Sequence, residues 1–292
     1  MTAATTDPMT AATTEPVNSL VIEPHSAAGP LRFGLRDLYT MTRRYVLRAR
    51  RQGDVIFGSV LSPIIFVVLF GYVFGSAITV PGGHYRAYLL SGLFAQTTLF
   101  ASSTVAVAVA TDMSEGVIDR MRTLPVARSA VLVGRAVSNS IIGLPALAVM
   151  ITCALIVGWR AEAGLGQAVL GFLLLQLFGF AMAWVGIWLG MVARSPQSAD
   201  VLSMLPGFLL GFISNVFVPT QGMPAWLRVV AQWNPLSAVV AAARQLFGTT
   251  EGGPVPHVWS LQHPIPTTLA MTVLLLVIFV PLSVRLYTRR SR

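Results

Sequence analysis

The sequence predicts an all-α polytopic membrane protein with six transmembrane helices. Of its 292 residues, 54% are hydrophobic and only 11% are charged, whereas soluble domains usually contain about 25% charged residues. Six apolar stretches are each long enough to cross a hydrocarbon core of about 30 Å at 1.5 Å per residue. They lie at residues 55–78, 87–110, 137–158, 168–192, 201–218 and 266–284.

The N-terminal part divides into a tail and a basic helix. Residues 1–30 are rich in Thr, Ala and Pro and contain the motif MTAATT twice, a composition that buries no core, so we expect a disordered tail before a membrane domain at 31–292. Residues 31–52 carry seven arginines around an apolar face of Leu38, Met41 and Tyr45. This pattern predicts an interfacial helix. A charge cluster that only orients the first span explains it equally well.

The arginines predict the orientation in the membrane. The sequence contains no lysine, and all 20 basic residues are arginines. With both termini in the cytoplasm, only Arg86, Arg160, Arg228 and Arg244 lie outside and the other sixteen lie inside. This asymmetry is typical of a multi-pass protein of the plasma membrane with cytoplasmic termini. The Arg-rich, Ala-rich composition suggests a high-GC bacterium.

Residues 115–128, EGVIDRMRTLPVAR, form a dense charged segment between two apolar spans. Val117, Met121 and Leu124 share one helical face, and Asp119 and Arg122 are spaced to pair. The segment therefore predicts a short amphipathic cytoplasmic helix, suited to being pushed by a partner protein. A solvated helix that only rests on lipid headgroups is the alternative interpretation.

The loop between the last two spans, residues 219–265, predicts two short helices on the outer side. Pro224 is expected at the first position of the first helix. Asn234 and Pro235 are an N-cap and N1 pair for the second, which Gly248 is expected to end. The apolar faces are Trp226, Val229, Val230 and Trp233 in the first helix, and Leu236, Val239, Val240, Ala243 and Phe247 in the second. Both read as re-entrant or headgroup-level elements, or as an extracellular lid.

Neutral polar residues within the spans suggest a substrate path. Such side chains could line a route for a mostly apolar molecule, although Ser and Thr in membrane helices often bond to their own helix or to a neighbouring one. The candidates are Gln96, Thr97, Ser102, Ser103 and Asn215. Pairs of glycines four residues apart predict close helix packing. They are Gly71 and Gly75, Gly186 and Gly190, and Gly207 and Gly211.

Several chemistries are missing from the sequence. Without lysine the chain cannot form a P-loop, and it contains no HExxH or GxSxG motif, so we expect neither a catalytic residue nor a metal site. The acidic residues lie outside the spans, except Asp54, Asp112 and Asp200 at span ends. Proton-coupled transporters keep a carboxylate or His at membrane depth. An ion- or proton-coupled secondary exporter is therefore only the alternative function.

Together these motifs resemble those of the type-2 ABC exporter permeases, most closely the daunorubicin-resistance, DrrB-like branch. The resemblance covers nearly the whole chain after residue 31 but not the duplicated tail. Its most specific part is the similarity of residues 115–128 to the family's coupling helix. The residues are Glu115, Gly116, Val117, Asp119, Arg120, Met121, Arg122, Leu124, Pro125 and Arg128. The second part is similar to the family's outer re-entrant hairpin, with Met223, Pro224, Trp226, Leu227, Asn234 and Pro235.

The resemblance implies a permease subunit that is not itself an ATPase. Such a subunit pairs with a second copy or a sister permease and with nucleotide-binding ATPase subunits, which bind ATP and Mg²⁺. It exports a lipophilic drug, antibiotic or lipid and binds no nucleic acid. A sensory membrane protein, which needs no ATPase, is a further alternative.

Overall fold

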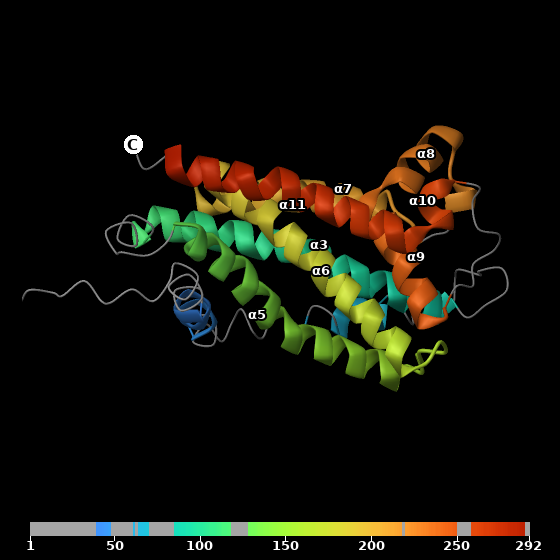
Figure 1. Ribbon diagram of the computed structural model, residues 1–292. Helices are drawn as coiled ribbons and strands as arrows, with labels where there is room; N and C mark the ends of the chain where they lie inside the picture. The colour runs from blue at the N-terminus through green and yellow to red at the C-terminus, as the bar shows by residue number, and fades with distance from the viewer. Residues whose placement is uncertain are drawn as a thin grey trace, which may run out of the picture.

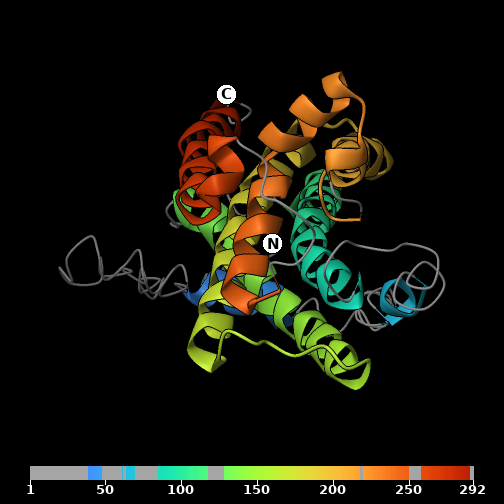
Figure 2. The same cartoon turned by 90° about the vertical axis from the view of Figure 1, so that its right-hand side faces the viewer.

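The computed structural model describes residues 39–47, 61, 64–69, 85–117, 128–217, 220–249 and 258–289. Within these ranges the regular elements are helices, and no strand is present. Figures 1 and 2 show the long helices side by side, with the short helices between residues 220 and 262 at one end. The elements are α3 (Tyr85–Ser114), α5 (Arg128–Ile156), α6 (Leu165–Val192), α7 (Pro196–Phe212), η2 (Thr220–Gly222), α8 (Ala225–Trp233), α9 (Pro235–Phe247), α10 (Trp259–Gln262) and α11 (Pro264–Arg289).

In the described part of the chain, four helices are long and apolar enough to cross a membrane: α3, α5, α6 and α11. They confirm the predicted second, third, fourth and sixth spans as apolar helices. Most of the predicted first span, residues 55–78, lies outside the described residues, so the count of six stays a prediction.

The predicted fifth span, residues 201–218, was misplaced. The helix there is α7, which begins at Pro196 and ends at Phe212. It begins early because Ser195 and Ser198 form a capping box, in which each side chain accepts the other's backbone N–H, and Pro196 occupies the first helical position. As a result Asp200, predicted at a span end, lies inside the helix.

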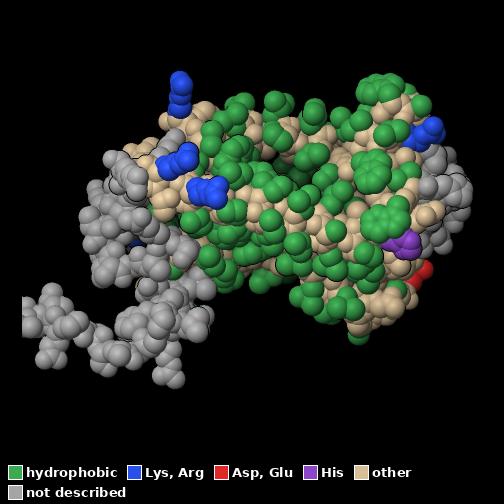
Figure 3. Space-filling model, turned by 45° about the horizontal axis from the view of Figure 1, so that its top comes forward, with side chains coloured by type: hydrophobic (Ala, Val, Ile, Leu, Met, Phe, Trp, Pro, Cys, Tyr) green, Lys and Arg blue, Asp and Glu red, His purple; other side chains and the backbone are tan. Residues whose placement is uncertain are grey.

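Helices α3 and α6 form the centre of the bundle. They are largely enclosed by other helices, whereas α5 and α11 expose most of their length. Hydrophobic side chains cover the middle of the face in Figure 3, and arginines lie toward its ends. This belt matches a surface in contact with lipid.

The two ends of the bundle differ. One end, here called the arginine end, contains helix 39–47, the end of α3, the start of α5 and the C-terminal end of α11 (Figure 1). Its described arginines include Arg43, Arg44, Arg135, Arg194, Arg285 and Arg289. The opposite end, here called the hairpin end, contains α8, the start of α9 and α10.

Two glycines allow α6 to approach α3 closely. A Cβ atom at Gly186 would collide with the backbone oxygen of Ser102, and one at Gly190 with that of Ala106. This pair therefore packs as predicted, within one chain. The second pair differs, since a Cβ at Gly207 would meet nothing within 4 Å. Gly71 and Gly75 lie outside the described residues.

Adding one methyl group should distinguish these two glycine pairs. We expect Gly186→Ala to destabilise the fold by about 1–3 kcal/mol, because the backbone of α3 cannot yield without moving the helix. The matched control, Gly207→Ala, adds the same methyl group where space is open and should leave stability unchanged. Thermal unfolding in detergent, followed by tryptophan fluorescence, measures both. An equal loss in the two variants would contradict this account of the packing.

Candidate functional site

The described part of the predicted coupling segment is its start. Helix α3 ends at Ser114, and the backbone N–H groups of Glu115 and Gly116 bond back to Thr111 and Met113. Gly116 has φ of 67°, the left-handed conformation that glycine adopts freely at a helix end. The chain therefore turns away from α3 here. Residues 118–127 lie outside the described residues, with Asp119, Arg120, Met121, Arg122, Leu124 and Pro125 among them, and Arg128 is the first residue of α5.

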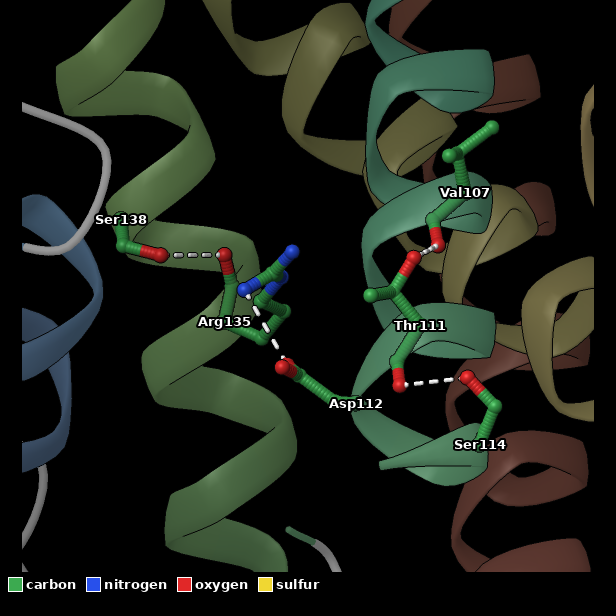
Figure 4. A network of polar contacts seen from close by, with 6 residues as sticks. All are labelled: Val107, Thr111, Asp112, Ser114, Arg135 and Ser138. Carbon is green, nitrogen blue, oxygen red and sulfur yellow. Dashed lines mark hydrogen bonds and ion pairs between the residues drawn. The ribbon is translucent and has the colours of Figure 1, made fainter. Parts of the chain in front are cut away.

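A buried ion pair joins the two helices that flank this segment. Arg135 of α5 donates to Asp112 of α3 at 3.4 Å, and their side chains are only 15% and 5% exposed. Figure 4 shows the two side chains pointing toward one another across the gap between the helices. The segment 115–128 therefore begins shortly after Asp112 of α3 and ends shortly before Arg135 of α5, so this ion pair joins its two flanks.

Helix 39–47 contacts the same ion pair through Tyr45. The Arg135 guanidinium lies 4.7 Å from the centre of the Tyr45 ring, within reach of a cation–π interaction. Burial raises the pKa of the Tyr45 hydroxyl to about 12. Met41 and Tyr45 pack on Val131, and Val117 lies against them. We call Tyr45, Asp112 and Arg135 the junction.

The helix predicted over residues 31–52 is present in its described part, residues 39–47, and its interfacial position stays a prediction. Within residues 39–47 the chain is helical, Met41 and Tyr45 are buried, and Arg43 and Arg44 are exposed. The partners of Tyr45 were not predicted. One signal existed, because Asp112 and Arg135 carry opposite charges just before and just after the charged segment.

At the hairpin end, Asn234 connects two helices. Its Oδ1 accepts from the backbone N–H of Leu236, which caps α9 as predicted. Its Nδ2 donates to the carbonyl groups of Leu210 and Ile213 at the end of α7. Pro235 is the first residue of α9, and Gly248 ends it as predicted. One amide therefore satisfies backbone groups at the end of one helix and at the start of another.

The first hairpin helix begins one residue later than predicted. Pro224 is the N-cap of α8 rather than its first residue, because its ψ of 148° is extended. Met223 and Leu227 are half-buried at this helix start. Trp226 and Trp233 are 72% and 56% exposed. The apolar face of α8 therefore points away from the bundle.

The second hairpin helix is buried on more than its predicted apolar face. In α9 the polar residues Ser237 and Arg244 are buried along with the predicted apolar face, and the helix packs on α3, α6 and α11. Packing on several sides, rather than on one, explains this difference. The choice between a re-entrant element, a headgroup-level element and an extracellular lid stays open.

Arg244, which the sequence predicts on the outer side, lies buried in α9. Its guanidinium donates to the backbone oxygens of Tyr88, Asn215 and Val216 at 2.9–3.2 Å, and it lies 3.4 Å from the centre of the Tyr88 ring. The side chain thus ties α9 to the start of α3 and to the turn after α7. Arg244 lies four residues after Val240 and eight after Leu236, a spacing that puts all three residues on the buried face of the helix.

The five residues predicted to line a path occupy different environments. Thr97 and Ser102 donate to carbonyl groups of their own helix. Gln96 and Asn215 are 3% and 8% exposed, and their amide oxygens have no hydrogen-bond partner among the described residues. Ser103, by contrast, is half-exposed and contacts α7.

Known proteins match this chain over most of its length. The family model described as "ABC-2 type transporter" matches residues 36–247, from just before helix 39–47 to the end of α9. The daunorubicin resistance ABC transporter permease protein DrrB1 of Streptomyces coeruleorubidus is 32% identical over 232 residues, which cover 80% of this chain and 79% of that protein. The doxorubicin resistance ABC transporter permease protein DrrB of Mycobacterium tuberculosis is 27% identical over 253 residues, covering 82% and 86%.

A double-mutant cycle tests the junction. We expect Asp112→Ala and Arg135→Ala each to destabilise the protein, because each leaves a buried charge behind. The double variant should lose less than the sum, with a coupling free energy of about 1–3 kcal/mol from thermal unfolding in detergent. As a control, Arg194→Ala removes an exposed arginine at the same end and should have little effect. Additive losses would show that the pair contributes nothing.

The role of Arg244 is tested by keeping its charge and changing its shape. Lysine places all its donors on one nitrogen, whereas the guanidinium donates from two, so we expect Arg244→Lys to cost about 1–3 kcal/mol through unsatisfied buried groups. The matched control is Arg228→Lys on the exposed surface of α8, which should change stability by less than about 0.5 kcal/mol. Chemical denaturation in mild detergent gives both values. Equal effects would refute a bridging role for Arg244.

Proposed function

The chain belongs to the ABC-2 type transporter family as the transmembrane permease subunit of an exporter, and we propose that it moves a lipophilic drug, antibiotic or lipid outward across the plasma membrane. The relatives named for daunorubicin and doxorubicin resistance support this substrate class. The apolar α3, α5, α6 and α11 provide the membrane-crossing scaffold.

The energy source is a separate subunit. Membership of this family implies an ATP-binding partner, and a chain without lysine cannot form a P-loop of its own. We assign ATP and Mg²⁺ to that partner. A second copy of this chain or a sister permease completes the transporter. The arginine end faces the cytoplasm, in keeping with the positive-inside asymmetry of the sequence.

One observation carries the proposed mechanism: the junction connects both flanks of the coupling segment to helix 39–47. In this mechanism Asp119, Arg120 and Arg122 contact the ATPase surface, and Val117 and Met121 anchor the segment through apolar contacts. When the ATPase subunits close, they push the segment. Because Asp112 and Arg135 bridge α3 and α5, the two helices move together rather than apart.

The hairpin end responds at the other side of the membrane. Asn234 and Arg244 fasten α9 to the end of α7, and Arg244 also fastens it to the start of α3. A displacement of α3 therefore reaches α8 and α9 through backbone contacts. We assign these two helices to the outer boundary of the substrate path, where the exposed Trp226 and Trp233 meet the membrane interface.

The family assignment does not favour an ion- or proton-coupled exporter. The two mechanisms are separable by experiment. Export by the proposed complex continues when the proton gradient is collapsed while ATP is maintained, and it stops when ATP is removed.

Two substitutions in the coupling segment test the mechanism. We expect Glu115→Ala and Arg120→Ala to lower export by about tenfold, within the range of coupling free energies of about 1–3 kcal/mol, while ATP hydrolysis and membrane insertion continue. Export and hydrolysis are measured together in vesicles that contain the permease and its ATPase. Arg228→Ala, at the hairpin end, is the control and should retain coupling. Full export by both variants at normal expression would exclude the assignment.

A further inference from the structure

A carboxylate lies on the surface of α7 among apolar side chains. Asp200 is exposed, and its Oδ1 accepts a hydrogen bond from Ser103 Oγ of α3 at 3.1 Å. Ser203, one turn further along α7, lies 3.1 Å from the same Ser103 oxygen. Beside them Val201 and Met204 are 67% and 52% exposed. The charged group is therefore set in a surface that otherwise suits lipid or a lipophilic molecule.

The position along the bundle places this carboxylate inside the apolar belt. Ser103 lies about three turns, or about 16 Å, before α3 ends at Ser114. The Asp112 and Arg135 pair lies between that level and the helix end. On the other side of α3, Ser102 faces Gly186, well before α6 ends at Val192. Asp200 thus lies deeper than the junction charges.

Two further features lie inside the contact between α3 and α7. Gln96 is two turns from Ser103 on the same face of α3, is 3% exposed, and has an unpaired Oε1 among the described residues. Its Nε2 lies against Gly211 of α7. Between these levels, Gly207 faces open space within 4 Å. Polar groups therefore continue inside this helix contact, from Asp200 toward the hairpin end.

A structural role at the helix start does not explain Asp200. The capping box of Ser195 and Ser198 already satisfies the start of α7, and Asp200 lies beyond the first turn, where the helix dipole has its main effect. Among the described residues, no arginine pairs with it. An ionised carboxylate within the apolar belt is costly unless a cation compensates it.

We propose that Asp200 recognises the protonated amine of a lipophilic substrate, with Ser103 holding the carboxylate in place. This inference rests on the proposed export function and defines its substrate class as amphipathic amines. The open side of the carboxylate accepts an ammonium N–H group while the apolar body of the substrate lies on Val201 and Met204.

The test compares two probes that differ in one charge. Dansylcadaverine carries a primary amine, and its N-acetyl derivative is neutral with the same fluorophore. ATP-dependent transport of each is measured in proteoliposomes that contain the permease with its ATPase. The variants are Asp200→Asn, which keeps the size and an acceptor for Ser103, and Glu162→Gln, a matched control that removes an exposed charge at the hairpin end.

The wild-type complex should prefer the amine by about 10–100-fold in kcat/KM, the value of one charge-assisted hydrogen bond. Asp200→Asn should bring this preference to within about twofold of unity while transport of the neutral probe persists. Ser103→Ala should weaken the preference partially, and Glu162→Gln should keep it. Asp200→Glu should restore much of it.

Other outcomes overturn the inference. A wild-type complex that transports both probes equally, or an Asp200→Asn variant that keeps the preference, removes the amine site but leaves the export function standing. Equal loss of both probes in Asp200→Asn, with dissociation in size-exclusion chromatography, assigns Asp200 to an ion pair with the second permease. If the wild-type complex transports neither probe and neither alters its ATP hydrolysis, both the inference and the lipophilic-substrate proposal fail.

Discussion

The bridge between Asp112 and Arg135 is the interaction on which the arginine end depends. A buried pair of this kind gives little net stability, since desolvation offsets much of the attraction, but it specifies which groups must meet. Here it fixes the distance between the end of α3 and the start of α5. The Tyr45 ring closes over it and brings helix 39–47 into the same unit. Because this one unit holds both ends of the coupling segment, a displacement of the segment moves α3 and α5 together.

The hairpin end uses a different device. Arg244 and Asn234 bond mainly to backbone oxygens rather than to acidic side chains. They therefore stabilise positions at which helices begin or end. Between the two ends, Gly186 and Gly190 bring the backbones of α6 and α3 into contact, which leaves these helices little freedom to slide. The molecule thus combines two fastened ends with a stiff centre, and a small displacement at one end reaches the other.

The features that the sequence predicted correctly are local ones. The limits of α9 are set by Asn234, Pro235 and Gly248, because capping depends on neighbours within a few residues. Long apolar runs predict membrane helices because a run of sufficient length can cross the hydrocarbon core. The partners of Arg244 and Asp200 are far away in the chain, and no spacing rule identifies them. The early start of α7 was missed because the serine caps precede the apolar run. Most of the coupling segment lies outside the described residues and stays a prediction.

The double use of the Asn234 amide has a chemical consequence for the durability of the protein. Deamidation to aspartate would replace the donor toward Leu210 and Ile213 with a negative oxygen facing two carbonyl groups, and the end of α7 would be repelled. The common route to that damage is attack by the next backbone nitrogen on the side-chain amide. At this position the next residue is Pro235, which carries no N–H, so the connection between the two helices is protected against slow ageing by the same residue that starts α9.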